Sequence, residues 1–247
     1  APVDTIVEIG PGLGFLTREL APRARRVVAV ELDARLLAIV RAELADQPHV
    51  EFVHGDALGG PGRSAAPEIP AAIEAAHARG GVALLVANLP YAVAGPLLAA
   101  VAALPELPER AVLLVQRELA ERLAAGAGTT AYGGLSATVQ ALFRVELLRL
   151  VAPEVFRPRP KVWSAVVQLD RRPDPAPELA AAAARREFGV FVRRLFQQRR
   201  KALRSVLPAA AAAIGRLAPE PVPPALSSQR AEQLGPAELI QLWASCR

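Results

Sequence analysis

Short apolar runs alternate with segments of helical periodicity along the first two thirds of the chain. The runs are rich in β-branched residues and end at glycine, proline or a polar residue, which is the pattern of buried strands. Strands are predicted at 5–9, 26–30, 50–53, 82–86 and 111–115. Helices are predicted at 15–20, 34–44, 71–79, 96–104, 117–125 and 135–143. This alternation predicts an α/β fold with a mostly parallel sheet that is covered on both faces.

The pattern changes in the last third of the chain. Residues 145–151 and 164–169 predict a late antiparallel pair of strands around the loop 153–161. Residues 171–178 contain three prolines and read as a linker. Only helices are predicted beyond it, at 179–196, 199–207 and 236–245. We therefore predict an α/β domain over residues 1–172 and a small helical domain over residues 173–247.

Composition narrows the class of protein. Hydrophobic residues make up 52% of the 247 positions and aromatic residues only 4%, which predicts a sizeable aliphatic core. The single cysteine, Cys246, excludes a disulfide framework and a thiolate metal site, and the three histidines lack ligand spacing. Residues 82–105 carry no charge, but Asn88 and two prolines interrupt them. We expect a soluble, cytoplasmic protein with no metal site.

Charge is distributed unevenly between the two predicted domains. Residues 1–173 hold 18 basic and 18 acidic side chains, whereas residues 174–247 hold 11 and 6, which accounts for the whole net charge of +5. Eight of the basic residues fall within 185–204, where Glu187 is the one acid. This segment is either a solvated helix face or a surface that contacts phosphates, and a basic tail beside a neutral domain favours a nucleic-acid partner.

A glycine-rich loop follows the first predicted strand. Gly10, Gly12 and Gly14 alternate there, so the backbone can approach a ligand closely at the start of a helix. Glu31 ends the next strand about 20 residues later, where a carboxylate suits ribose hydroxyls. Asp56 follows the third strand and could accept from an adenine amino group. These features alone fit a nicotinamide cofactor as well as S-adenosylmethionine.

The fourth strand ends in Asn88-Leu89-Pro90-Tyr91. Pro90 interrupts the strand and keeps its neighbour extended, so an amide and an aromatic ring are placed at the carboxyl end of the strand. Open α/β sheets bind their ligands at this edge. The same four residues could also be a simple turn that ends a strand.

Taken in order, these motifs resemble the ribosomal RNA adenine N6-dimethyltransferases, which use S-adenosylmethionine and modify small-subunit rRNA. The resemblance covers essentially the full chain. The cofactor half matches at Glu8-Ile9-Gly10-Pro11-Gly12, Glu31-Leu32-Asp33, Gly55-Asp56-Ala57 and Asn88-Leu89-Pro90-Tyr91. Further matches are Gln116-Arg117-Glu118, Tyr132-Gly133-Gly134-Leu135-Ser136, the stretch from Phe156 to Ser164, and the tail motifs from Phe196 to Lys201 and from Arg230 to Glu232.

The resemblance implies a Rossmann-like methyltransferase sheet with a helical, RNA-binding C-terminal domain. It also implies that two adjacent adenosines near the 3′ end of 16S rRNA, in a pre-30S particle, receive methyl groups, and that the enzyme acts as a monomer. The cofactor-binding residues would be Gly10, Gly12, Glu31, Asp56, Ala57 and Asn88. The catalytic loop would be Asn88, Leu89, Pro90 and Tyr91, with Tyr91 stacked on the target base. The RNA contacts would be Phe156, Lys161, Arg199, Arg200 and Lys201.

The sequence departs from the family pattern in three places. Relatives normally begin with a basic segment containing Gly-Gln-Asn-Phe-Leu that closes over the cofactor, and the sequence as given has no counterpart of it. Ala92 stands where the family usually has Asn, and Trp163 where it usually has an acidic residue. Two other functions stay open: a large-subunit rRNA methyltransferase of the macrolide-resistance type, and a non-catalytic ribosome-assembly factor. A nicotinamide-dependent dehydrogenase fits less well, because nothing in the sequence indicates a hydride-transfer acid or base.

Overall fold

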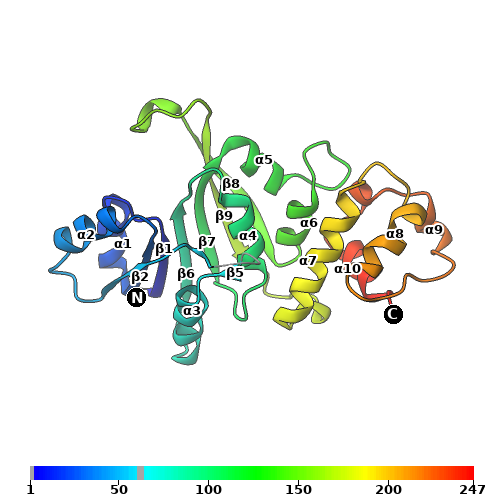
Figure 1. The fold of residues 1–247 in the computed structure, drawn as a ribbon, viewed down its shortest axis with the longest axis horizontal. Coiled ribbons are helices and arrows are strands. Elements are labelled where there is room, and N and C mark those ends of the chain that lie inside the picture. Colours follow the sequence, from blue (N-terminus) through cyan, green and yellow to red (C-terminus); the bar gives the residue numbers. More distant parts are fainter. Residues whose placement is uncertain (1–2, 60–63) are drawn as a thin grey trace. The chain divides into compact units, whose positions relative to one another are not determined.

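The computed structural model describes residues 3–59 and 64–247 (Figure 1). The main strands are β1 Val3–Ile9, β2 Ala24–Glu31, β3 Val50–His54, β6 Ala83–Asn88, β7 Arg110–Gln116, β8 Phe143–Val151 and β9 Ser164–Arg171. The helices are α1 Phe15–Leu20, α2 Ala34–Glu43, α3 Glu68–Ala78, α4 Ala94–Ala102, α5 Arg117–Ala124, α6 Gly134–Gln140, α7 Ala182–Phe196, α8 Leu203–Ala212, α9 Pro224–Ser227 and α10 Pro236–Ala244. Part of the predicted connection between β3 and α3, residues 60–63, lies outside the described residues, and β4 Leu58–Gly59 pairs with β5 Ser64–Ala65 on either side of it.

The strands form one sheet in the order β3-β2-β1-β6-β7-β9-β8. The pairs from β3 to β7 are parallel, and β9 runs antiparallel to β7 with Gln116 opposite Ser164. The chain crosses from β1 to β2 on one side and returns through β6 on the other, so the order reverses between β1 and β6. Ligands bind at such a reversal in open α/β sheets. The predicted fold class, a mostly parallel Rossmann-like sheet with a late antiparallel strand and C-terminal helices, is confirmed.

The core of the sheet is aliphatic: β1, β2, β6 and β7 all contribute fully buried residues, and Leu84 and Val86 of β6 are partly buried. Val7, Val27, Leu85, Leu113 and Val115 are each at most 1% exposed. Central parallel strands are buried by helices on both sides, which explains why these segments are nearly continuous apolar runs in the sequence. Two buried acidic residues interrupt these apolar runs, Glu8 of β1 and Glu31 of β2.

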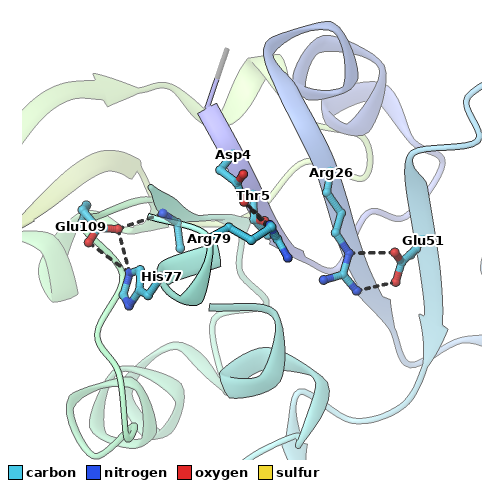
Figure 2. Close-up of polar contacts among 8 residues, drawn as sticks. Asp4, Thr5, Arg26, Glu51, His77, Arg79 and Glu109 are labelled. Atoms are coloured by element: carbon cyan, nitrogen blue, oxygen red, sulfur yellow. Dashed lines mark hydrogen bonds and ion pairs between the residues drawn. The ribbon is translucent and has the colours of Figure 1, made fainter. Parts of the chain in front are cut away.

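Ion pairs connect the strands at the amino end of the sheet, opposite the predicted site (Figure 2). Arg26 of β2 makes a bidentate pair with Glu51 of β3 at 2.7 Å for each contact, which lowers the pKa of the Glu51 carboxyl. Arg79, after α3, donates to Asp4 of β1 at 2.7 Å. His77 Nε2 lies 3.1 Å from the Glu109 carboxylate, which also accepts from the Ala83 amide. These contacts hold the strands in register at the end of the sheet opposite the glycine loop.

The chain forms two compact units. The first contains the residues up to 120 together with 146–171, and the second contains 121–145 together with 172–247. In the second unit, α7 is amphipathic and buries Phe188, Phe191, Val192 and Leu195 on one face. Residues 121–145, which the sequence pattern places with the sheet, pack with these C-terminal helices. Within the described ranges, no helix is long and apolar enough to cross a membrane.

Several predicted helices begin or end at different residues in the structure. The predicted helix 199–207 is wrong in its first turn, because α8 starts at Leu203 and Ala202 instead pairs with Arg230 in a β-bridge. Pairing of Ala202 with a segment about thirty residues away overrides the local helical preference. The predicted helix 135–143 ends at Gln140, and Phe143 already belongs to β8.

Candidate active site

The glycine loop after β1 needs glycine for conformation and for space. Gly10, Gly12 and Gly14 have φ angles of 71°, 57° and 78°, in the left-handed region that side chains disfavour. A Cβ at Gly14 would lie 2.5 Å from the Val40 side chain of α2, so this glycine allows close packing of the helix. A Cβ at Gly12 would meet nothing within 4 Å. The loop therefore presents open backbone at Gly12, as a ligand cradle requires.

Glu31, the last residue of β2, holds this loop. It is only 7% exposed, and its two carboxylate oxygens accept from the Gly12 amide at 3.0 Å and the Asp33 amide at 2.9 Å. Asp33 in turn accepts from the Arg35 amide and caps the start of α2. The structure therefore brings together the glycine loop and the predicted ribose-binding carboxylate.

Asp56 and Ala57 lie at the same edge of the sheet. The Gly55 amide donates to the Glu31 carbonyl at 2.9 Å, which joins the loop after β3 to the end of β2. Asp56 is exposed, and its Oδ1 accepts from the Leu58 amide at 2.9 Å. The Ala57 carbonyl accepts from Ala66 at the β5 end of the small hairpin.

The Asn88 loop stands beside the glycine loop, on the other side of the strand reversal. A Cβ built on Gly10 would lie 3.9 Å from the Asn88 carbonyl oxygen. The Asn88 side chain is exposed, whereas Leu89 is buried and its amide donates to the Leu114 carbonyl at 3.2 Å. Leu89 thus fixes the loop, while the Asn88 side chain remains exposed.

Ser164 supports Tyr91, and sequence reasoning did not find this role. The Tyr91 hydroxyl lies 2.9 Å from the Ser164 hydroxyl, and Ser164 is fully buried at the start of β9. Ser164 lies within the family motif that begins at Phe156, but a serine in a motif does not show which ring it supports. The antiparallel insertion of β9 beside β7 is what brings the two hydroxyls together.

Glu8 is a buried carboxylate that sequence reasoning also left without a role. It is 1% exposed, and in the described part of the chain neither of its oxygens has a hydrogen bond of normal geometry. Burial raises the pKa of Glu8 to about 7; the Thr17 hydroxyl opposes this shift and the Glu31 charge adds to it. The signal in the sequence was an acidic residue inside an apolar strand, two positions before Gly10. Unsatisfied acceptors next to the loop fit a cofactor that carries positive charge.

The residues predicted to contact RNA fall into both compact units. In the first unit, Phe156 is half-buried and Lys161 exposed; both belong to the connection between β8 and β9, which we call the arm (residues 152–163). In the second unit, Arg200 and Lys201 are exposed. Among the described residues, no group of three or more metal-ligating side chains could hold a metal ion.

Arg199 makes structural contacts within the second unit. It donates to the Thr130 and Tyr132 carbonyls at 3.1 and 3.3 Å and lies 3.4 Å from Glu232. The Tyr132 ring packs edge-to-face on Phe196, with centroids 5.8 Å apart. The motifs around Tyr132 and Phe196, separated by more than sixty residues, thus form one cluster, and the predicted RNA role of Arg199 remains untested.

Together, the parallel sheet, the glycine loop with Glu31 and the Asn88 loop define a Rossmann-like methyltransferase. A family model described as "Ribosomal RNA adenine dimethylase" matches residues 1–214. The chain belongs to this family.

Curated relatives agree with this assignment. The ribosomal RNA small subunit methyltransferase A of Synechococcus sp. strain JA-3-3Ab is 44% identical over 206 residues, which cover 82% of this chain and 67% of that protein. The protein of the same name from Geobacter metallireducens is 41% identical over 202 residues, covering 82% and 69%. The chain thus spans about two thirds of the length of these relatives.

Solved structures show the same fold over nearly the whole chain. A dimethyladenosine transferase from Plasmodium falciparum matches with a TM-score of 0.71 and 23% identity, over 97% of this chain and 88% of that one. The 23S rRNA methyltransferase ErmE matches with a TM-score of 0.63 and 27% identity, over 98% and 92%.

Proposed function

We propose that this protein transfers methyl groups from S-adenosylmethionine to the N6 amines of two adjacent adenosines near the 3′ end of small-subunit rRNA. The observation that carries the proposal is the placement of the Asn88 loop beside the glycine loop. A Cβ built on Gly10 would lie 3.9 Å from the backbone carbonyl oxygen of Asn88. A methyl donor held at one loop would face an amine held at the other. The small-subunit activity named for the curated relatives supports the choice of substrate.

The residues along β1, β2 and β3 fit the cofactor. Gly10 and Gly12 would cradle its methionine part, because a side chain at Gly12 would fill the open side of the loop. Glu31 would accept from the ribose hydroxyls while it continues to hold the Gly12 amide. Asp56 would accept from the adenine amino group, with Ala57 beside the ring. Bound there, S-adenosylmethionine supplies an electrophilic sulfonium methyl group, and no metal or strong base is needed.

The chemical difficulty lies in the target amine, whose lone pair is delocalised into the adenine ring. The Asn88 side-chain carbonyl and a backbone carbonyl of the loop 88–91 can accept the two amine protons. Accepting both protons draws the nitrogen toward tetrahedral geometry and directs its lone pair away from the ring. Asn88 would therefore act by positioning and by stabilising the charge that develops on the nitrogen.

Tyr91 would hold the extruded base by stacking. The hydrogen bond to buried Ser164 fixes the phenol, so the ring is oriented before the base arrives. Phe156, half-buried on the arm, would cover the other face of the base.

The likeness to ErmE favours one alternative, a large-subunit rRNA adenine N6-methyltransferase. The decisive experiment measures transfer of a labelled methyl group to small ribosomal subunits that lack the modification and, separately, to protein-free 23S rRNA. We expect four methyl groups on the small subunit, two on each of two adjacent adenosines, and none on 23S rRNA. Labelling of 23S rRNA alone would favour the ErmE-type function.

The Asn88→Ala variant tests the proposed catalytic role of Asn88 in the same assay. It should bind S-adenosylmethionine within a few-fold of the unchanged protein yet lose nearly all turnover, because its proposed contacts form with the target amine. If this variant methylates rRNA at the same rate as the unchanged protein, Asn88 has no catalytic role and is only part of the turn that ends β6. Small-subunit binding without methyl transfer in both proteins would instead indicate a non-catalytic assembly factor.

A further inference from the structure

The chain has two tryptophans in opposite environments. Trp243 in α10 is 3% exposed and donates to Glu187 at 3.0 Å. Trp163 is 47% exposed at the end of the arm. Tryptophan combines a large apolar ring with a polar N–H group and is enriched at interfaces, so half-exposed Trp163 is a candidate contact for a partner.

The backbone at Trp163 is held beside the catalytic loop. The Trp163 carbonyl accepts from the Arg117 amide at the start of α5 at 2.9 Å. The next residue, Ser164, pairs with Gln116 of β7 and contacts the Tyr91 hydroxyl at 2.9 Å. Trp163 is therefore one residue from the group that orients Tyr91, at the same edge of the sheet as Asn88.

The arm that ends at Trp163 is rich in cationic residues. The arm carries Arg157, Arg159 and Lys161 against one acid, Glu154, and that acid already pairs with Arg159. An exposed aromatic ring next to several cations matches a single-stranded RNA segment, whose bases stack on aromatic rings while its phosphates pair with the cations.

From these observations we infer that Trp163 is a stacking platform for the nucleobase adjacent to the target adenosine. This inference rests on the proposed function, because Tyr91 takes the target base and leaves its neighbour to Trp163. Stacking of the neighbour would hold the strand in register while the target base is extruded. Trp163 is then an RNA-positioning residue and makes no contact with the reacting atoms.

Tryptophan fluorescence tests this contact directly, since Trp163 is the exposed one of two. The probe is an RNA oligonucleotide with two adjacent adenosines in a single-stranded stretch, together with versions that are abasic on either side of the pair. We expect the RNA to quench the exposed emission and to protect it from acrylamide. Trp163→Ala should weaken RNA binding by about 5- to 160-fold, the range of one lost base stack, and Trp163→Phe by less.

The abasic RNAs identify the nucleotide. One abasic RNA should bind the unchanged protein more weakly than intact RNA, by the same factor as the Trp163→Ala substitution weakens binding of intact RNA. The Trp163→Ala variant should bind this abasic RNA and intact RNA with equal affinity. Leu148→Ala, which removes a similarly exposed apolar side chain from β8, is the control. It should change neither the RNA affinity nor the quenching of the Trp163 emission. Thermal unfolding of Trp163→Phe and Trp163→Ala checks that both variants fold.

The outcomes separate this inference from the proposed function. If the unchanged protein methylates small subunits while Trp163→Ala binds RNA equally well, the stacking role is wrong and the function stands. If RNA leaves the Trp163 emission unchanged, the stacking role is also wrong. If RNA protects Trp163 but no methyl group is transferred, the proposed function falls; Trp163 then contacts RNA, but its role beside a target adenosine is wrong as well.

Discussion

The Glu31 carboxylate accepts a hydrogen bond from the Gly12 amide at 3.0 Å, so the end of β2 holds the glycine loop in its open conformation. The same carboxylate accepts from the Asp33 amide at the start of α2. One buried group therefore organises the loop, the helix entry and the proposed ribose contact.

Glu31→Ala should weaken both cofactor binding and folding. The binding free energy of the cofactor should become less favourable by about 1.5–3 kcal/mol, the range for hydrogen bonds to a charged group. The glycine loop should also lose the hydrogen bond between the Gly12 amide and Glu31. Calorimetry with S-adenosylmethionine and thermal unfolding measure the two effects. Glu51→Ala, which removes an exposed carboxylate from β3, should leave cofactor affinity unchanged. Unchanged cofactor affinity in Glu31→Ala would contradict the ribose assignment.

Glu8 should make the protein less stable as the pH rises toward neutrality. Burial raises the pKa of Glu8 in the folded protein to about 7, above the unfolded value of 4.5, so the folded state binds the extra proton in that window. The free energy of unfolding should therefore fall as the pH rises from 4.5 to 7, by about 3 kcal/mol in all, and level off above pH 7. Urea unfolding of the unchanged protein and of Glu8→Gln across pH 5–8 measures this. Equal pH profiles would show that Glu8 ionises normally.

Ser164 and Tyr91 should be coupled in catalysis. Ser164→Ala and Tyr91→Phe each remove one side of the 2.9 Å contact and should lower kcat/KM for methyl transfer by a few-fold. In the double variant the losses should not add, with a coupling energy of about 0.5–1.5 kcal/mol, the net value of one hydrogen bond. Measuring kcat/KM for all four proteins completes the cycle. Fully additive losses would mean that the contact does not orient the ring.

The basic segment should divide into a structural and an RNA-binding part. Arg199→Ala should lower stability by about 1–2 kcal/mol, because it frees two carbonyls and Glu232. Arg200→Ala with Lys201→Ala should leave stability unchanged and reduce the magnitude of the salt slope of RNA binding by about 1.4 to 1.8, the contribution of two phosphate contacts. Chemical unfolding and RNA titrations at several salt concentrations measure these effects. An unchanged slope would make Arg200 and Lys201 a solvated helix edge.

The local sequence alone was enough to predict the fold class, most of the helices and strands, and the family. The period of apolar residues predicted the strands and most helices because a central parallel strand must be apolar on both faces. The three glycines and Glu31 predicted a cofactor-binding edge, because a glycine-rich turn after one strand and a carboxylate at the end of the next are typical of such sites. The order of the motifs identified the family.

The tertiary structure decided which residues meet. The antiparallel pairing of β9 with β7 brings Ser164 to Tyr91, and no local pattern encodes that contact. The sequence predicts an RNA contact for Arg199, which stays a prediction, and gives no sign that Arg199 also donates to the carbonyls of Thr130 and Tyr132. The raised pKa of Glu8 likewise depends on its complete burial. Sequence period reports whether a residue faces the core, whereas partners distant in the chain, and the desolvation they cause, exist only once the chain has folded.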